Sequence, residues 1–246
     1  MSLSKLGSMT GLNIIQQREM SWEAPPNLPE SFDVRERWPE ATIPILNQEH
    51  CQSCWAFATV AAASIRFNIK GRNHGVLSAQ DLVSCDTYDG ACRGGGFFTP
   101  HAHMLETGAT TEKCMSYKSA GGRVPMCPDK CDNGSKIIRH RYEAIAEYTV
   151  EDVMEGLMND GPMFFAFNVY EDFGLYRSGI YQHKTGREKG GHAVTLMGWG
   201  EDNGVKYWLL QNSWGPEWGE NGFFRMRRGT NECGCESYGF ITGYVQ

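Results

Sequence analysis

The chain has 246 residues, of which 41% are hydrophobic and 21% charged, a composition typical of globular proteins and not of disordered ones. Its formal net charge of −6 argues against a nucleic-acid partner, because nucleic-acid-binding surfaces are basic. No run of roughly 18 apolar residues occurs, so we expect no membrane span, and residues 1–27 lack the apolar core of a signal peptide.

Taken in chain order, residues 1–27 are polar and end in an Ala-Pro-Pro-Asn segment typical of an extended linker. An Ala-rich apolar run predicts a helix from Cys54 to Lys70, capped by Ser53 at its start and ended by Gly71. Further helices are expected over Ser78–Val83, Pro100–Glu106 and Val150–Asp160. Short β-type runs follow at Pro162–Tyr170, Gly191–Gly198, Lys206–Asn212 and Gly222–Arg227. This order predicts an α+β protein with two lobes, a mainly helical one over 28–135 and a mainly β one over 136–246.

The nine cysteines are unevenly distributed, since seven of them lie between Cys51 and Cys131 in a Gly- and polar-rich region. Crowding of this kind, with irregular spacing, favours disulfides formed outside the cytosol. An odd total leaves at least one free thiol if no intermolecular bond forms, and Cys54 is the natural candidate.

Four residues in distinctive settings form a candidate thiol-nucleophile set: Gln48, Cys54, His192 and Asn212. Cys54 opens the long helix, and a helix N-terminus favours the thiolate that acts as nucleophile. A histidine can exchange a proton with this thiol if an amide oxygen, here that of Asn212, orients its ring. The Gln48 amide and the Cys54 N–H can then stabilise an oxyanion, so the set predicts acyl transfer.

Several sequence blocks carry a resemblance to the papain family of cysteine proteases, and most of all to its cathepsin B branch, from about Leu28 to the C-terminus. These blocks are LPESFDVRERWP, CQSCWAFA, ACRGGG, VYEDFGLYRSGIYQH, GGHAVTLMGWG and NSWGPEWGENGFFRMRRGTNECGCES. The resemblance implies a two-lobed papain-like α+β fold, with a helical left lobe, a β-barrel-like right lobe and the active site in the cleft between them. It also implies a cysteine peptidase that needs no cofactor and no metal.

The same resemblance assigns roles to individual residues. Cys54 becomes the nucleophile, His192 the general acid/base, Asn212 its orienting partner and Gln48 the oxyanion donor. Trp214 would shield the Asn212–His192 bond from water. Substrate would be bound by Gly94, Gly95, Gly191, Trp214, Trp218 and Tyr238. The implied disulfides are Cys51–Cys92, Cys85–Cys127 and Cys114–Cys131, with Cys233 free and Cys235 in place of an aliphatic residue.

The sequence departs from cathepsin B at three places. The segment Met115–Met126 is short and lacks the His-His pair of the loop that gives cathepsin B its dipeptide-removing exopeptidase activity. We therefore expect endopeptidase activity, with dipeptidyl carboxypeptidase activity as the alternative. Tyr238 occupies the position of an acid that receives the residue second before the scissile bond, which favours apolar or aromatic side chains there. Glu49-His50 and Gln52 stand where Gly, Ser and Gly are usual.

The resemblance further implies peptide and protein substrates, protein inhibitors of papain-like proteases as partners, a monomer, and a lysosome-like or endosomal vesicle, or secretion. Residues 1–27 stand in the place of a propeptide, which in this family runs backwards through the cleft. The sequon at Asn133 would then be a glycosylation acceptor.

Rival readings remain from other classes of protein. They are a redox Cys51-x-x-Cys54 motif, a zinc site formed by Cys51, Cys54, Cys233 and Cys235, and a non-proteolytic binding homologue. The remaining histidines have no catalytic context: His101, His103 and His183 are read as surface or loop residues, and His50 as a rim residue.

Overall fold

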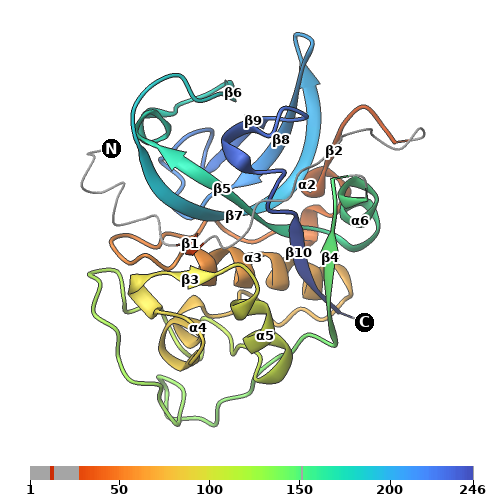
Figure 1. Ribbon diagram of the computed structural model, residues 1–246. Coiled ribbons are helices and arrows are strands. Elements are labelled where there is room, and N and C mark those ends of the chain that lie inside the picture. Colours follow the sequence, from red (N-terminus) through yellow and green to blue (C-terminus); the bar gives the residue numbers. More distant parts are fainter. Residues whose placement is uncertain (1–11, 14–27, 151, 246) are drawn as a thin grey trace.

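The computed structural model describes residues 12–13, 28–150 and 152–245. Figure 1 shows two lobes, a lower one that contains α3 (Cys54–Ile69), α4 (Ala79–Cys85) and α5 (Thr99–Glu106), and an upper one formed largely by a sheet. Two further helices, α2 (Val34–Arg37) and α6 (Val153–Asp160), lie beside the sheet. The predicted two-lobed α+β fold is confirmed.

The helices of the lower lobe begin and end close to the predicted residues. In α3 every residue from Cys54 to Phe67 is buried on all faces, which its many alanines permit because they let neighbouring elements approach closely. The helix ends before Gly71, whose φ of 74° is the left-handed conformation that glycine adopts without strain. At α4, one of the helices expected from the sequence, the Ser78 side chain caps the first turn by accepting a hydrogen bond from the Asp81 N–H (3.0 Å).

The sheet has the strand order β4-β10-β5-β7-β8-β9-β6. Its members are β4 (Ala144–Tyr148), β5 (Met163–Tyr170), β6 (Ile180–Tyr181), β7 (Glu188–Asp202), β8 (Val205–Gln211), β9 (Phe223–Arg227) and β10 (Phe240–Tyr244). Within the described residues β4 and β6 form its two ends and do not pair, so the expected barrel-like lobe is a curved but open sheet. Strands β4 and β10, which were not predicted from the sequence, pair antiparallel along their full lengths.

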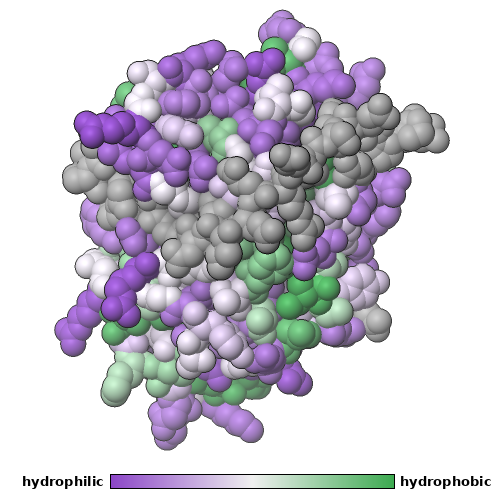
Figure 2. All heavy atoms as spheres, viewed as in Figure 1, coloured by the Kyte–Doolittle hydropathy of each residue, from purple (hydrophilic) through white to green (hydrophobic). Residues whose placement is uncertain are grey.

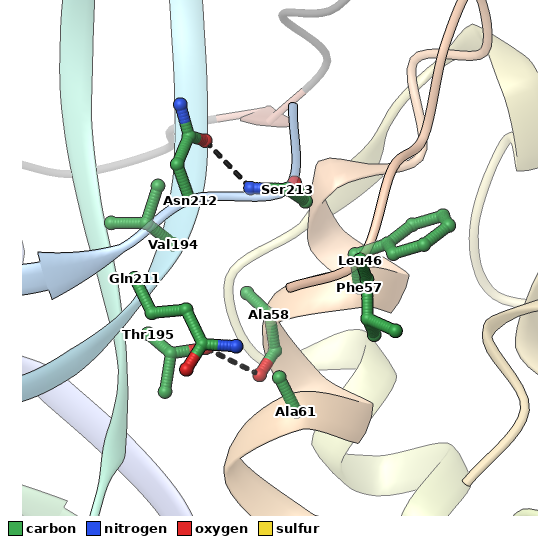
Figure 3. Close-up of a pocket in the computed structure, with 9 residues that line it drawn as sticks. All are labelled: Leu46, Phe57, Ala58, Ala61, Val194, Thr195, Gln211, Asn212 and Ser213. Atoms are coloured by element: carbon green, nitrogen blue, oxygen red, sulfur yellow. Dashed lines mark hydrogen bonds between the residues drawn. The ribbon is translucent and has the colours of Figure 1, made fainter. Parts of the chain in front are cut away.

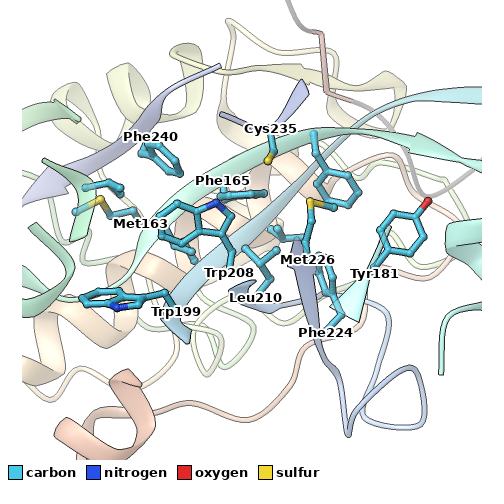
Figure 4. Close-up of a cluster of buried hydrophobic side chains, with 14 of the residues drawn as sticks. Met163, Phe165, Tyr181, Trp199, Trp208, Leu210, Phe224, Met226, Cys235 and Phe240 are labelled. Carbon is cyan, nitrogen blue, oxygen red and sulfur yellow. The ribbon is translucent and has the colours of Figure 1, made fainter. Parts of the chain in front are cut away.

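Strands β5 and β7 form the wall that the two lobes share. Their side chains alternate: Ala166 and Ala193 face the cluster around α3, whereas Phe165 and Val194 face the core of the upper lobe. Small residues on the helix side allow α3 to pack closely against the strands, while large ones fill the upper core with the tryptophans seen in Figure 4. Burial on both faces explains why the sequence of β7 lacks a polar alternation.

The lobes interlock beyond this wall. From the N-terminal side, β2 (Phe32–Asp33) pairs with the far end of β7, and from the C-terminal side Val245 packs in the cluster of the helical lobe. The hydroxyl of Thr195 donates to the carbonyl oxygen of Ala58 across the interface at 3.4 Å, beside a cavity of about 10 Å³ (Figure 3). Packing therefore crosses the boundary placed at residue 135, and movement of one lobe would disturb the other.

The face of the molecule seen in Figure 2 is mostly hydrophilic, and its apolar side chains gather over the lower, helical lobe. Among the described residues, none of the helices has the length and apolar character needed to cross a membrane.

Candidate active site

The candidate nucleophile, Cys54, is the first residue of α3, and its side chain is buried. The helix dipole places partial positive charge at this end, which stabilises a thiolate. The predicted capping role of Ser53 is wrong, since its side chain makes no capping bond. The Ser53 hydroxyl instead forms a hydrogen bond with the hydroxyl of Tyr117 (3.1 Å), a residue distant in sequence. Because the side chain points to Tyr117, it does not bond to the N–H groups of the first turn of α3.

The structure pairs His192 with Asn212. Histidine Nε2 lies 2.8 Å from Asn212 Oδ1, which also accepts the Ser213 N–H at 2.8 Å. Because this oxygen accepts both bonds, Nε2 must carry a proton, which leaves Nδ1 as the nitrogen that could exchange a proton with a thiol. The indole of Trp214 lies 4.8 Å from the imidazole, ring centre to ring centre, and is itself 5% exposed, so it separates the pair from water.

The candidate oxyanion donor, Gln48, is fully buried and its amide is held at both ends. Its Oε1 accepts a hydrogen bond from the hydroxyl of Ser213 (2.8 Å), and its Nε2 donates to the carbonyl oxygen of Cys51 (2.8 Å). The backbone N–H of Gln48 also donates to Ser213 O at 2.9 Å. Ser213 therefore joins the Asn212 segment to the Gln48 loop, a role that its place in the sequence, next to Asn212, could have suggested.

Glu49 replaces the usual glycine but keeps the glycine conformation, with φ of 53°. Asn47 stabilises this strained turn: its Oδ1 accepts the Glu49 N–H (3.1 Å) and its Nδ2 donates to the Glu49 carboxylate (2.6 Å). Glu49 thus places a negative charge beside Gln48, on a backbone turn with positive φ.

The backbone conformation and the packing of this structure also favour glycine at the candidate substrate-binding positions. Gly94 has φ of 103°, a conformation open to glycine, and a Cβ on Gly95 would come within 2.5 Å of the Trp55 ring. Both Gly95 and Gly191 pair through their backbones with β1 (Leu12–Asn13), which runs parallel to β3 (Gly95–Gly96) and antiparallel to β7. An extended chain therefore bridges the two lobes at the glycines where a peptide is expected.

Trp218 and Tyr238, the other two aromatic residues expected to bind substrate, have different surroundings. Trp218 is 6% exposed and packs edge-on against Trp214 at 5.1 Å, so most of it belongs to the upper core. Tyr238 packs at the edge of the helical-lobe cluster, and its hydroxyl donates to Asn168 Oδ1 at 3.0 Å. Asn168 is the cross-strand partner of Gly191, which puts Tyr238 on the same side of the site as that glycine.

The cysteine pairs are those that the resemblance implies: Cys51–Cys92, Cys85–Cys127 and Cys114–Cys131. Since Cys51 is bonded to Cys92, the redox reading of Cys51 and Cys54 is wrong, and the described residues contain no cluster of His, Cys, Asp or Glu fit for a metal. Cys233 and Cys235 remain thiols, and burial raises the pKa of both.

Two of the histidines read as surface or loop residues are in fact core residues. His101 and His103 lie in α5 with 0% and 3% of their surface exposed. Burial lowers the pKa of His101 to about 3, so this side chain stays neutral. His183 is partly exposed, with Nδ1 3.1 Å from an Asp172 oxygen, and His50 is exposed as expected.

Comparison with known proteins agrees with this geometry. The family model described as papain family cysteine protease matches residues 28–242. The chain is 44% identical to cathepsin B-like CP3 of Giardia intestinalis over 216 residues, which cover 85% of this chain and 72% of that relative. It is 38% identical to cathepsin B-like cysteine proteinase 4 of Caenorhabditis elegans, with coverage of 85% and 73%. Among solved structures, procathepsin B S9 of Trypanosoma congolense matches 100% of this chain and 89% of its own length, with a TM-score of 0.89 and 30% identity.

Proposed function

The chain belongs to the papain family of cysteine proteases, and we propose that it is a cathepsin B-like endopeptidase whose nucleophile is Cys54. The observation that carries this proposal is the buried His192–Asn212 bond of 2.8 Å, formed in the lobe that packs directly against the helix bearing Cys54. Such a bond fixes one ring nitrogen and directs the other to proton exchange with a thiol.

In the proposed reaction the Cys54 thiolate attacks the peptide carbonyl, a C–S bond forms, and the carbonyl π electrons move onto oxygen. The Gln48 amide and the Cys54 N–H donate hydrogen bonds to this oxyanion. Collapse of the intermediate breaks the C–N bond, and the His192 imidazolium gives its proton to the leaving amine. Water, deprotonated by His192, then hydrolyses the acyl-enzyme and restores the thiolate.

We propose an endopeptidase because Met115–Met126 contains no histidine and is bound back onto the helical lobe. The N–H of Lys118 donates to the Gln80 side chain of α4 (2.7 Å), and the carbonyl oxygen of Ala120 accepts the His50 N–H (2.9 Å). A substrate C-terminus would find no histidine pair here. A 12-residue peptide offered with a free or an amidated C-terminus should be cut internally at equal rates, and successive loss of dipeptides from the free acid alone would identify the alternative carboxypeptidase.

Labelling tests the nucleophile. A peptidyl epoxide should modify the protein with one equivalent per chain, and both labelling and proteolysis should vanish in Cys54→Ser. Cys233→Ser is the matched control, because burial raises the pKa of that thiol and it should take up no label in the parent protein. A protein that labels at Cys54 yet cleaves no peptide would be a non-proteolytic homologue.

We further propose that Tyr238 sets the preference for the residue second before the scissile bond. Tyr238 packs against an apolar cluster that contains Phe97, Ala166 and Ala193, and its own side chain carries no negative charge to compensate a buried guanidinium. Tyr238→Glu should therefore raise kcat/KM for an Arg peptide relative to a Phe peptide by about tenfold, or ~1.4 kcal/mol. Tyr244→Glu, at an exposed tyrosine at the end of β10, is the control. An unchanged Arg-to-Phe ratio in Tyr238→Glu would contradict the assignment.

Residues 1–27 are proposed to act as a propeptide, and the pairing of residues 12–13 with Gly95 and Gly191 supports this. Procathepsin matches such as that of T. congolense are consistent with it. The three disulfides support maturation outside the cytosol, and hence a lysosome-like vesicle or secretion. We expect a monomer, with peptide and protein substrates and protein inhibitors of papain-like proteases as partners.

A further inference from the structure

Tyr117 lies in the short segment that replaces a longer loop, yet its side chain reaches the catalytic loop. Its hydroxyl donates to the carbonyl oxygen of Gln48 (3.0 Å) and forms a second bond with Ser53 Oγ (3.1 Å). Because a phenol has one proton, the first bond makes Tyr117 the donor to Gln48 and Ser53 the donor to Tyr117. One hydroxyl therefore joins the residue that carries the oxyanion amide to the residue before the nucleophile.

Tyr117 is held both at its ring and at its backbone. The ring packs edge-on against Phe57 in the first turn of α3, with ring centres 4.8 Å apart. The backbone N–H of Tyr117 donates to the Glu112 carboxylate (2.8 Å). Burial raises the pKa of Tyr117 to about 12, so the hydroxyl stays protonated and able to donate at any pH at which a cysteine protease works.

The segment that carries Tyr117 is anchored to the body of the helical lobe. Gln80 of α4, which is 1% exposed, accepts the Lys118 N–H (2.7 Å) and donates to Ser119 Oγ (2.9 Å). The next residue, Ala120, accepts the N–H of His50 at 2.9 Å. The loop from Gln48 to Ser53 is thus tied at both of its ends and near its middle to a segment that is rigidly attached to α4.

We propose that Tyr117 is a positioning residue for the oxyanion site. Its hydroxyl holds the Gln48 amide and the Cys54 N–H at the separation that the tetrahedral intermediate requires. The two donors come from opposite ends of one loop, and displacement of a catalytic group by about 1 Å can cost up to 100-fold in rate. Tyr117 touches neither substrate nor thiol in this role. The inference rests on the proposed function.

The test compares Tyr117→Phe with the parent full chain under identical treatment. The variant keeps the ring against Phe57 and loses the hydroxyl, so kcat should fall about tenfold with KM unchanged, less than the 10²–10³-fold expected for loss of an oxyanion donor. The inhibition constant of a peptide aldehyde, whose carbonyl becomes a tetrahedral oxyanion on attack by the thiol, should rise by the same factor. Alkylation of Cys54 by iodoacetamide, which displaces iodide at a saturated carbon and forms no oxyanion, should keep its rate.

Tyr88→Phe is the matched control, because it removes a hydroxyl that bonds the Glu106 carboxylate (2.6 Å) at an exposed position away from the loop. An unchanged kcat in Tyr117→Phe overturns the proposal, and so does an alkylation rate that falls in parallel with kcat. If Tyr117→Phe does not fold, Ser53→Ala decides, with an expected two- to threefold loss in kcat and the same split between aldehyde and iodoacetamide. Activity of the parent chain tests the proposed function separately.

Discussion

Replacing His192 with alanine should lower kcat/KM for peptide substrates by about 10³-fold, the range expected for loss of a general acid/base. The imidazole is held by Asn212 at 2.8 Å and packed against Trp214 and Phe167. In the proposed reaction its loss removes both the proton acceptor for the thiol and the proton donor for the leaving amine. Steady-state kinetics on a fluorogenic peptide would measure the loss.

His183→Ala is the matched control for that experiment. This histidine lies in the same lobe and also has an oxygen partner, since its Nδ1 lies 3.1 Å from Asp172, but it is partly exposed and outside the proposed site. Its removal should leave kcat/KM within about twofold. A His192→Ala variant that retains a tenth of the parental kcat/KM would exclude His192 as the general base.

The parts of the site that the sequence predicted are those whose signal is local. Cys54 at a helix start, His192 beside Gly191, and Asn212 before Ser213-Trp214 each stand in a recognisable run of residues. The long helices and strands could be predicted for the same reason, because the spacing of apolar residues along a segment reports the face that it buries.

What the sequence could not predict depends on contacts between distant segments. Strand β10 contains a glycine within its five residues, which weakens its local signal, and it is held by pairing with β4, about 100 residues earlier in the chain. Ser53 looked like a helix cap, and only the position of Tyr117 in space shows that its hydroxyl is used elsewhere. His101 and His103 looked exposed because histidine is polar, yet α5 turns both of them inward.

The same kind of long-range contact should dominate the stability of the helical lobe. Asp81, in the first turn of α4, is fully buried and receives two bonds from Arg139, Nη2 at 2.7 Å and Nε at 2.9 Å, besides the Thr110 N–H at 2.8 Å. Removal of Asp81 leaves the Arg139 guanidinium, whose side chain is 25% exposed, without its counter-charge, and a buried N–H without its acceptor.

Asp81→Ala should therefore lower the free energy of unfolding by about 2–4 kcal/mol, because water reaches the guanidinium only in part. Urea unfolding followed by circular dichroism, in a Cys54→Ser background that prevents autolysis, would measure it. Glu143→Ala is the matched control, because that carboxylate pairs with Arg72 at 3.7 Å while 38% exposed and should cost less than about 1 kcal/mol. Asp81→Asn removes the charge but keeps the shape of the side chain, and its amide oxygen can still accept the Thr110 N–H. If its loss in free energy of unfolding is close to that of Asp81→Ala, the stabilisation comes from the ion pair with Arg139. Equal losses in Asp81→Ala and Glu143→Ala would instead mean that water reaches Arg139 and screens it as it does an exposed arginine.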